Sequence, residues 1–78
     1  MEKVIVYTNT NCPHCRQVKE YLTGKGVAFE ERNIGQNDEY AQQVWNMGMR
    51  AVPVTVIGDH RILGMNKLQF EKYLGEQA

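Results

Sequence analysis

A short apolar run near the start of the chain, Val4–Tyr7 (VIVY), determines the fold class. Its residues are β-branched or aromatic, and no polar residue alternates with them. A strand of this kind is buried on both faces, so it needs helices on each side of its sheet. The run therefore predicts an α/β fold in which this segment is a central strand.

The remaining elements follow in the order β-α-β-α-β-β-α. Strands are predicted at 4–7, 27–34, 54–57 and 60–63, and the more polar second strand suits a sheet edge. The first helix should begin at Cys12 or Pro13 and end at 24–26. The second and third helices should follow caps at Asn37 and Asn66. Trp45, off the buried stripe of the second helix, is expected to half-cover the seam between helix and sheet, with contact to a partner protein as the alternative.

The connections predict how the strands pair. A strand–helix–strand unit gives a parallel pair through a right-handed crossover, whereas the two-residue turn Gly58-Asp59 gives an antiparallel hairpin. The expected structure is a four-stranded mixed sheet with helices on its faces. With 78 residues, we expect one domain over 1–78 and a monomer.

Charge and hydropathy exclude several classes of protein. Nine basic residues balance nine acidic ones without a long charge run, which argues against nucleic-acid binding and a polybasic membrane surface. No apolar stretch is long enough for a membrane span or a signal-peptide core. We therefore expect a cytoplasmic protein, and paired cysteines in that reducing compartment indicate catalysis or metal binding.

The motif Cys12-Pro13-His14-Cys15 stands at the predicted start of the first helix. A helix N-terminus favours negative charge, so it lowers a thiol pKa from about 8.5 and activates the thiolate. Cys12 should be exposed and attack a disulfide. Cys15, about one turn later and facing inward, should resolve the mixed disulfide. Pro13 stiffens the turn.

His14 is predicted to tune this pair. Imidazole is partly cationic near neutral pH, and a positive neighbour stabilises a thiolate. Stabilising the reduced form makes the disulfide a stronger oxidant. The alternative is that His14 is a tolerated polar residue at an exposed helix start.

Metal binding is the rival interpretation of the cysteine pair. A zinc site usually takes four ligands, and the chain offers one cysteine pair and two isolated histidines, His14 and His60. No metal site is predicted, although a zinc site or an iron–sulfur cluster shared between subunits remains the alternative. A purely structural disulfide would be reduced in the cytoplasm.

Four segments follow one another along the chain: Cys-Pro-x-Cys, FEERNI, Gly-x-Arg-x-Val-Pro at 48–53, and VIGDHRILG. Together they resemble the glutaredoxins, in particular the short glutaredoxin-like proteins that include NrdH-type redoxins. The resemblance implies a thioredoxin fold, strand order 2-1-3-4, no tightly bound cofactor, and reduction of protein or glutathione mixed disulfides. It also implies a cis Val52–Pro53 bond facing the cysteines, with the Val52 backbone pairing with substrate. A trans Pro53 that merely opens a strand fits the residues as well.

The chain departs from glutathione-using glutaredoxins where those proteins hold glutathione. It has Asn9 for the usual lysine, His14 for tyrosine, Ala51 for threonine, and 64–67 (GMNK) for the usual acidic pair. Of the expected glutathione contacts, Arg50 and the Val52 backbone remain. Met65 and Asn66 are candidate substrate contacts at the same rim. The expected electron source is therefore either glutathione or a thioredoxin reductase.

Overall fold

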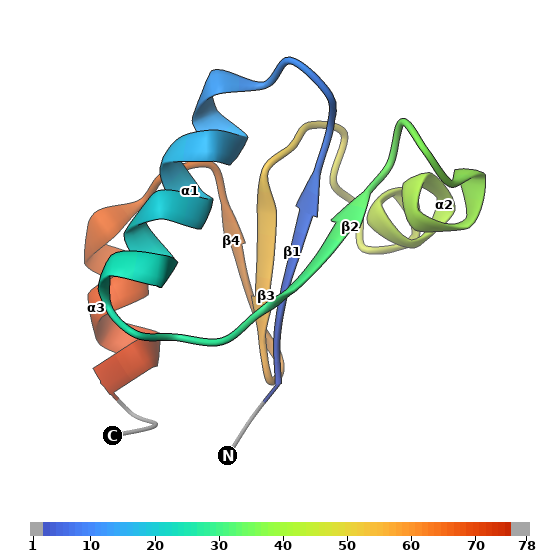
Figure 1. Ribbon diagram of the computed structural model, residues 1–78. Helices are drawn as coiled ribbons and strands as arrows, with labels where there is room; N and C mark the ends of the chain where they lie inside the picture. Colours follow the sequence, from blue (N-terminus) through green and yellow to red (C-terminus); the bar gives the residue numbers. More distant parts are fainter. Residues whose placement is uncertain (1–2, 76–78) are drawn as a thin grey trace.

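The computed structural model describes residues 3–75 and has the predicted element order (Figure 1). The strands are β1 (Val4–Thr8), β2 (Glu30–Asn33), β3 (Val54–Ile57) and β4 (His60–Leu63). The helices are α1 (Pro13–Gly24), α2 (Asp38–Asn46) and α3 (Lys67–Gly75).

The four strands form one mixed sheet in the order β2-β1-β3-β4. β1 pairs in parallel with β2 and antiparallel with β3, and the β3–β4 hairpin is antiparallel. Figure 1 shows α1 and α3 on one face of the sheet and α2 on the other. The predicted thioredoxin-type topology, strand order 2-1-3-4, is confirmed.

β1 is the central strand that the VIVY run predicts, because its residues contribute to a core on each face. Val4 and Val6 belong to the buried cluster that contains Leu22 of α1 and Phe70 of α3. Tyr7 belongs to the cluster on the other face, together with Val44 of α2. Alternate residues of the strand thus hold the two helix layers against one sheet.

β2 is shorter than the predicted 27–34. The Val27 amide donates to the Leu22 carbonyl across 2.9 Å, so it belongs to the ending of α1. Glu30, opposite Ile5, is the first residue of this segment with a partner in β1. The residue pattern at 27–34 predicts an extended backbone, but only the residues that pair with β1 form a strand. The pairing with β1 therefore sets the length of β2. Its edge position is confirmed.

The helix caps follow the prediction. The Asn37 side chain accepts from the Glu39 amide, and the Asn66 Oδ1 accepts from the Gln69 amide at 3.2 Å. The expectation for Trp45 is wrong, since 61 % of this residue is exposed. Val44 takes the buried position of α2, and the next residue points about 100° away, toward solvent.

Within residues 3–75 the longest helix, α1, has 12 residues. None of the helices in this part of the chain is long and apolar enough to cross a membrane.

Candidate active site

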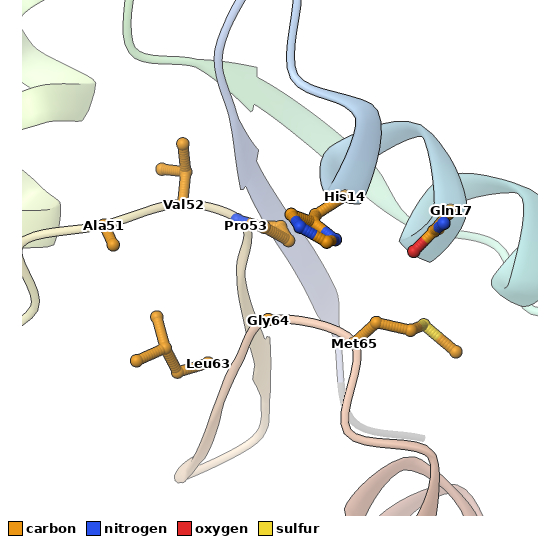
Figure 2. A pocket seen from close by; sticks show the side chains of 8 residues that line it. All are labelled: His14, Gln17, Ala51, Val52, Pro53, Leu63, Gly64 and Met65. Carbon is orange, nitrogen blue, oxygen red and sulfur yellow. The ribbon is translucent and has the colours of Figure 1, made fainter.

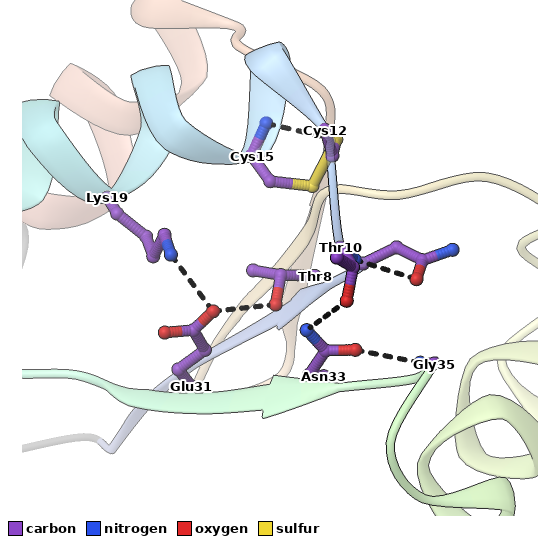
Figure 3. Close-up of a disulfide and its surroundings, with 9 residues drawn as sticks. Thr8, Thr10, Cys12, Cys15, Lys19, Glu31, Asn33 and Gly35 are labelled. Atoms are coloured by element: carbon purple, nitrogen blue, oxygen red, sulfur yellow. Dashed lines mark hydrogen bonds and ion pairs between the residues drawn. A yellow bond between two sulfur atoms is a disulfide. The ribbon is translucent and has the colours of Figure 1, made fainter.

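The cysteine pair lies at the junction between the loop that follows β1 and the start of α1. A disulfide joins Cys12 to Cys15, with their Cα atoms 5.2 Å apart (Figure 3). Cys12 is the N-cap of α1 and has an extended backbone, and Pro13 is the first helical residue, as predicted. The Cys15 amide donates a hydrogen bond to the Cys12 Sγ across 3.2 Å.

The two cysteines differ in burial. Cys15 is 2 % exposed and packs inward from α1 like Val18 and Leu22, which follow it at helical spacing. Cys12 is partly exposed at the end of the loop. Solvent and a large substrate can therefore reach the Cys12 sulfur more readily than the Cys15 sulfur.

Polar side chains fix the loop that carries Cys12. The Asn9 Oδ1 accepts from the Thr10 amide at 2.8 Å, and the Asn33 Oδ1 accepts from the Gly35 amide at 2.8 Å. The Asn33 side-chain amide also reaches the Thr10 hydroxyl at 3.5 Å. A Cβ built on Gly35 would lie 2.5 Å from the Asn9 Oδ1, so the loop after β2 packs directly on the loop before α1.

A shallow groove, here called the cis-proline groove, adjoins the motif. Figure 2 shows its lining, which comes from α1, from the segment before β3, and from the end of β4: His14, Gln17, Ala51, Val52, Pro53, Leu63, Gly64 and Met65. The Val52–Pro53 bond is cis, as the family resemblance implies. The Gly64 amide donates to the Pro53 carbonyl across 2.8 Å and ties the two sides together. The groove thus brings together four predicted site residues: His14, Val52, Pro53 and Met65.

Arg50 and Asn66 lie outside this groove lining. Arg50 is exposed and lines a separate hollow with Trp45, Gly48 and Met49. Asn66 uses its side chain to cap α3. Both remain predictions as substrate contacts.

A second hollow, here called the polar hollow, contacts both cysteines and contains residues that sequence reasoning missed. Its charged lining residues are Arg16, Lys19 and Glu31. The Glu31 Oε2 accepts from the buried Thr8 hydroxyl at 2.8 Å and from the Lys19 Nζ at 3.0 Å (Figure 3). Lys19 follows Cys15 by four residues on the same helix, which is a sequence signal for proximity. Glu31 reaches the polar hollow through the register in which β2 pairs with β1.

The environment of Glu31 changes its acidity. Partial burial, the largest single contribution, raises the pKa of the Glu31 carboxyl. Hydrogen bonds from Thr8 and Lys19, together with the Lys19 charge, outweigh burial and hold this pKa below its usual range. Glu31 is therefore an anion at neutral pH.

Metal ligands do not cluster in the described part of the chain. Over residues 3–75, no three or more side chains of His, Cys, Asp or Glu are grouped in a way that could hold an ion. His60, considered as a ligand above, stacks on the Tyr73 ring with 3.9 Å between centroids.

Known proteins resemble this chain over nearly its whole length. The Glutaredoxin family model matches residues 4–62. The glutaredoxin-like protein NrdH of Lactococcus lactis is 36% identical over 69 residues, which are 88% of this chain and 96% of that relative.

Solved structures agree with the family match. The glutaredoxin of Archaeoglobus fulgidus has a TM-score of 0.80 at 31% identity, covering 95% of this chain and 87% of that one. The glutaredoxin-like NrdH-redoxin of Escherichia coli has a TM-score of 0.84 at 26% identity, covering 90% and 92%. Together with the Cys12–Cys15 disulfide at a helix start, these matches show that the chain belongs to the glutaredoxin family and is a dithiol–disulfide oxidoreductase.

Proposed function

We propose that the protein reduces disulfides of partner proteins, with Cys12 as the attacking thiol and Cys15 as the resolving thiol. The Cys12 thiolate attacks one sulfur of the substrate disulfide, and the other substrate sulfur leaves as a thiolate. The Cys15 thiolate then attacks the Cys12 sulfur, which releases the second substrate thiolate and leaves the Cys12–Cys15 disulfide. Two electrons pass from the cysteine pair to the substrate.

One observation carries this assignment of roles. Cys12 is the more exposed member of the pair, and its sulfur accepts a hydrogen bond from the Cys15 amide at the N-terminus of α1. The amide donor and the helix dipole both favour negative charge on that sulfur, so they are expected to lower the pKa of the Cys12 thiol. Pro13 restricts the backbone between the two sulfurs without adding a donor.

In this function, His14 tunes the redox properties of the cysteine pair. His14 is exposed on the first turn of α1, next in sequence to Pro13. A cationic imidazole there would stabilise the Cys12 thiolate, and with it the reduced protein.

The cis-proline groove is proposed to hold an extended segment of the substrate protein. Val52 lies just before β3 and outside the sheet ladder, so its backbone is available to pair with an added strand. Leu63 and Met65 supply apolar contact on the opposite wall. Asn66, which follows Met65, and Arg50 are proposed as outer contacts.

A flavoprotein thioredoxin reductase is proposed as the electron source, with glutathione as the alternative. Among the described residues, those that line the cis-proline groove include no carboxylate that could pair with the glutathione ammonium group. Arg50, the remaining partner for a glutathione carboxylate, belongs to the lining of a separate hollow. The E. coli NrdH-redoxin structure is described as having a thioredoxin-like activity profile. We also propose a cytoplasmic setting, where such a reductase keeps thiols reduced.

NADPH consumption by the oxidised protein tests the electron source. One reaction contains thioredoxin reductase, and a parallel reaction contains glutathione with glutathione reductase. We expect fast turnover with thioredoxin reductase and slow turnover with glutathione. The reverse result would contradict this electron source and would mean that Arg50 and the Val52 backbone suffice to bind glutathione.

A further inference from the structure

Resolution requires a buried thiol to lose its proton. The ordinary cysteine pKa is about 8.5, so Cys15 is mostly protonated near neutral pH unless its surroundings intervene. Only the thiolate attacks a disulfide. At 2 % exposure, Cys15 has little direct access to bulk water. A base that lines the polar hollow beside Cys15 would give the proton a shorter path than the one to bulk water.

The polar hollow contains one candidate base. Cys12 and Cys15 line this hollow together with the charged side chains Arg16 and Lys19 from α1 and Glu31 from β2. The two cations favour a thiolate but carry no basic lone pair at neutral pH. Glu31 is the single carboxylate among the described residues that line the hollow.

The Glu31 carboxylate is held in a fixed orientation. Thr8, which is 1 % exposed and ends β1, donates to Oε2. Lys19 donates to the same oxygen from α1. Over residues 3–75, the hydrogen bonds to this carboxylate end on Oε2. The other oxygen, Oε1, can therefore accept a further hydrogen bond. Figure 3 shows this carboxylate below the disulfide, with the contacts from Thr8 and Lys19 ending on one oxygen and the other oxygen on the side away from the two cysteines.

We propose that Glu31 receives the proton of Cys15 during resolution, directly or through one water molecule. The Cys15 thiol and the Glu31 carboxylate become a thiolate and a carboxylic acid. The thiolate attacks the Cys12 sulfur, the substrate thiolate leaves, and Glu31 then releases its proton to solvent. This inference rests on the proposed role of Cys15 as the resolving thiol.

Stopped-flow mixing of the reduced protein with an aromatic disulfide reagent tests the proposal, because the reagent releases one coloured thiol at each step. The first phase reports attack by Cys12, and the second, concentration-independent phase reports resolution by Cys15. Glu31→Gln should slow the second phase by at least about tenfold near neutral pH. This minimum is smaller than the ~10²–10⁴-fold rate contribution that is typical of a positioned base. The deficit should shrink in alkaline solution, where hydroxide removes the proton. The first phase should change little.

Two further variants make the result decisive. Glu20→Gln removes an exposed carboxylate of α1 outside the polar hollow and should leave both phases unchanged. Lys19→Met removes a partner that lowers the Glu31 pKa, so the acid fall-off of the second phase should move to higher pH. If Glu31→Gln does not fold, an unshifted fall-off in Lys19→Met overturns the proposal.

The outcomes separate this inference from the function on which it rests. An unchanged second phase in Glu31→Gln, or one slowed by the same factor at every pH, overturns the proton-acceptor role. A second phase that persists in Cys15→Ser contradicts the resolving role itself, whatever Glu31 does.

Discussion

The Cys15 amide donates to the Cys12 Sγ across 3.2 Å, so the buried cysteine supports the exposed one through its backbone. The same residue presents its sulfur to Cys12 in the disulfide. One turn of helix therefore provides both a donor to the attacking sulfur and the thiol that resolves it.

Cys15→Ser should trap covalent mixed disulfides between Cys12 and substrate proteins, because attack still occurs and resolution does not. Cys12→Ser should abolish turnover and trap nothing. Mass spectrometry of the protein after incubation with a disulfide-containing protein, before and after reduction, measures both results. Trapping by Cys12→Ser instead of Cys15→Ser would reverse the assigned roles.

His14→Ala should raise the pKa of the Cys12 thiol by up to about one unit, equivalent to about 1.4 kcal/mol, and make the couple more reducing. The rate of alkylation of the reduced protein as a function of pH measures this pKa. Gln17→Ala is the matched control, since Gln17 lines the same groove without a charge. An unchanged or lowered Cys12 pKa in His14→Ala would refute the tuning role.

Asn66→Ala should lower the free energy of unfolding by about 1 kcal/mol, the usual cost of losing an N-cap. The reason is the lost hydrogen bond from the Gln69 amide to the Asn66 Oδ1. Asn66→Asp keeps an acceptor and should retain most of the stability. Urea unfolding of the three proteins measures the difference. A loss of substrate affinity equal in both variants would instead support Asn66 as a substrate contact.

Much of the fold could be predicted because its signals are local. The apolar run of β1, the proline at the start of α1, the asparagine caps and the Gly58-Asp59 turn each act within a few residues. Strand order and the cis bond came from family resemblance rather than from these signals. The length of β2 and the exposure of Trp45 depended on which partners lay opposite them.

The candidate site also has one part that a local motif predicts and another part that depends on the fold. The cysteine pair at a helix N-terminus is visible in a stretch of four residues. The Thr8–Glu31–Lys19 cluster combines residues from β1, β2 and α1, and no short motif links them. The acidic and basic residues of β2 predicted only a polar edge. The ion pair of Glu30 with Arg32 is local, because the two residues share one face of β2. The pairs of Glu30 with Lys3 and of Glu31 with Lys19 depend on how β2 lies beside the other elements.

Stability should fall in acid partly through Glu31. Its pKa is lower in the folded protein than the ordinary 4.5, so its contribution is fully present above about pH 4.5. That contribution is lost as the pH falls through the folded pKa, because the proton then binds more tightly to the unfolded chain. Urea unfolding near neutral pH and in acid should show a smaller acid loss for Glu31→Gln than for the unsubstituted protein.

Glu30 provides the comparison for this acid loss. Its pKa is lowered by hydrogen bonds from Lys3 and Arg32. Glu30 precedes Glu31 on the strand, so it lies on the opposite face, and it is absent from the described lining of the polar hollow. Glu30→Gln should also reduce the acid loss while leaving the resolution rate unchanged. An acid loss identical in all three proteins would mean that these ion pairs are too well screened to stabilise the fold.

Gly35→Ala should disturb the loop that carries Cys12. The new Cβ would lie 2.5 Å from the Asn9 Oδ1, so the Asn9 side chain must move and release the Thr10 amide. Gly24→Ala is the control, because a Cβ there meets nothing within 4 Å and the residue ends a helix. We expect Gly35→Ala to be less stable than Gly24→Ala by about 1 kcal/mol, the typical value of one hydrogen bond. A double-mutant cycle identifies the cause: in an Asn9→Ala background, Gly35→Ala should cost nothing further, whereas an additive loss would place the strain elsewhere.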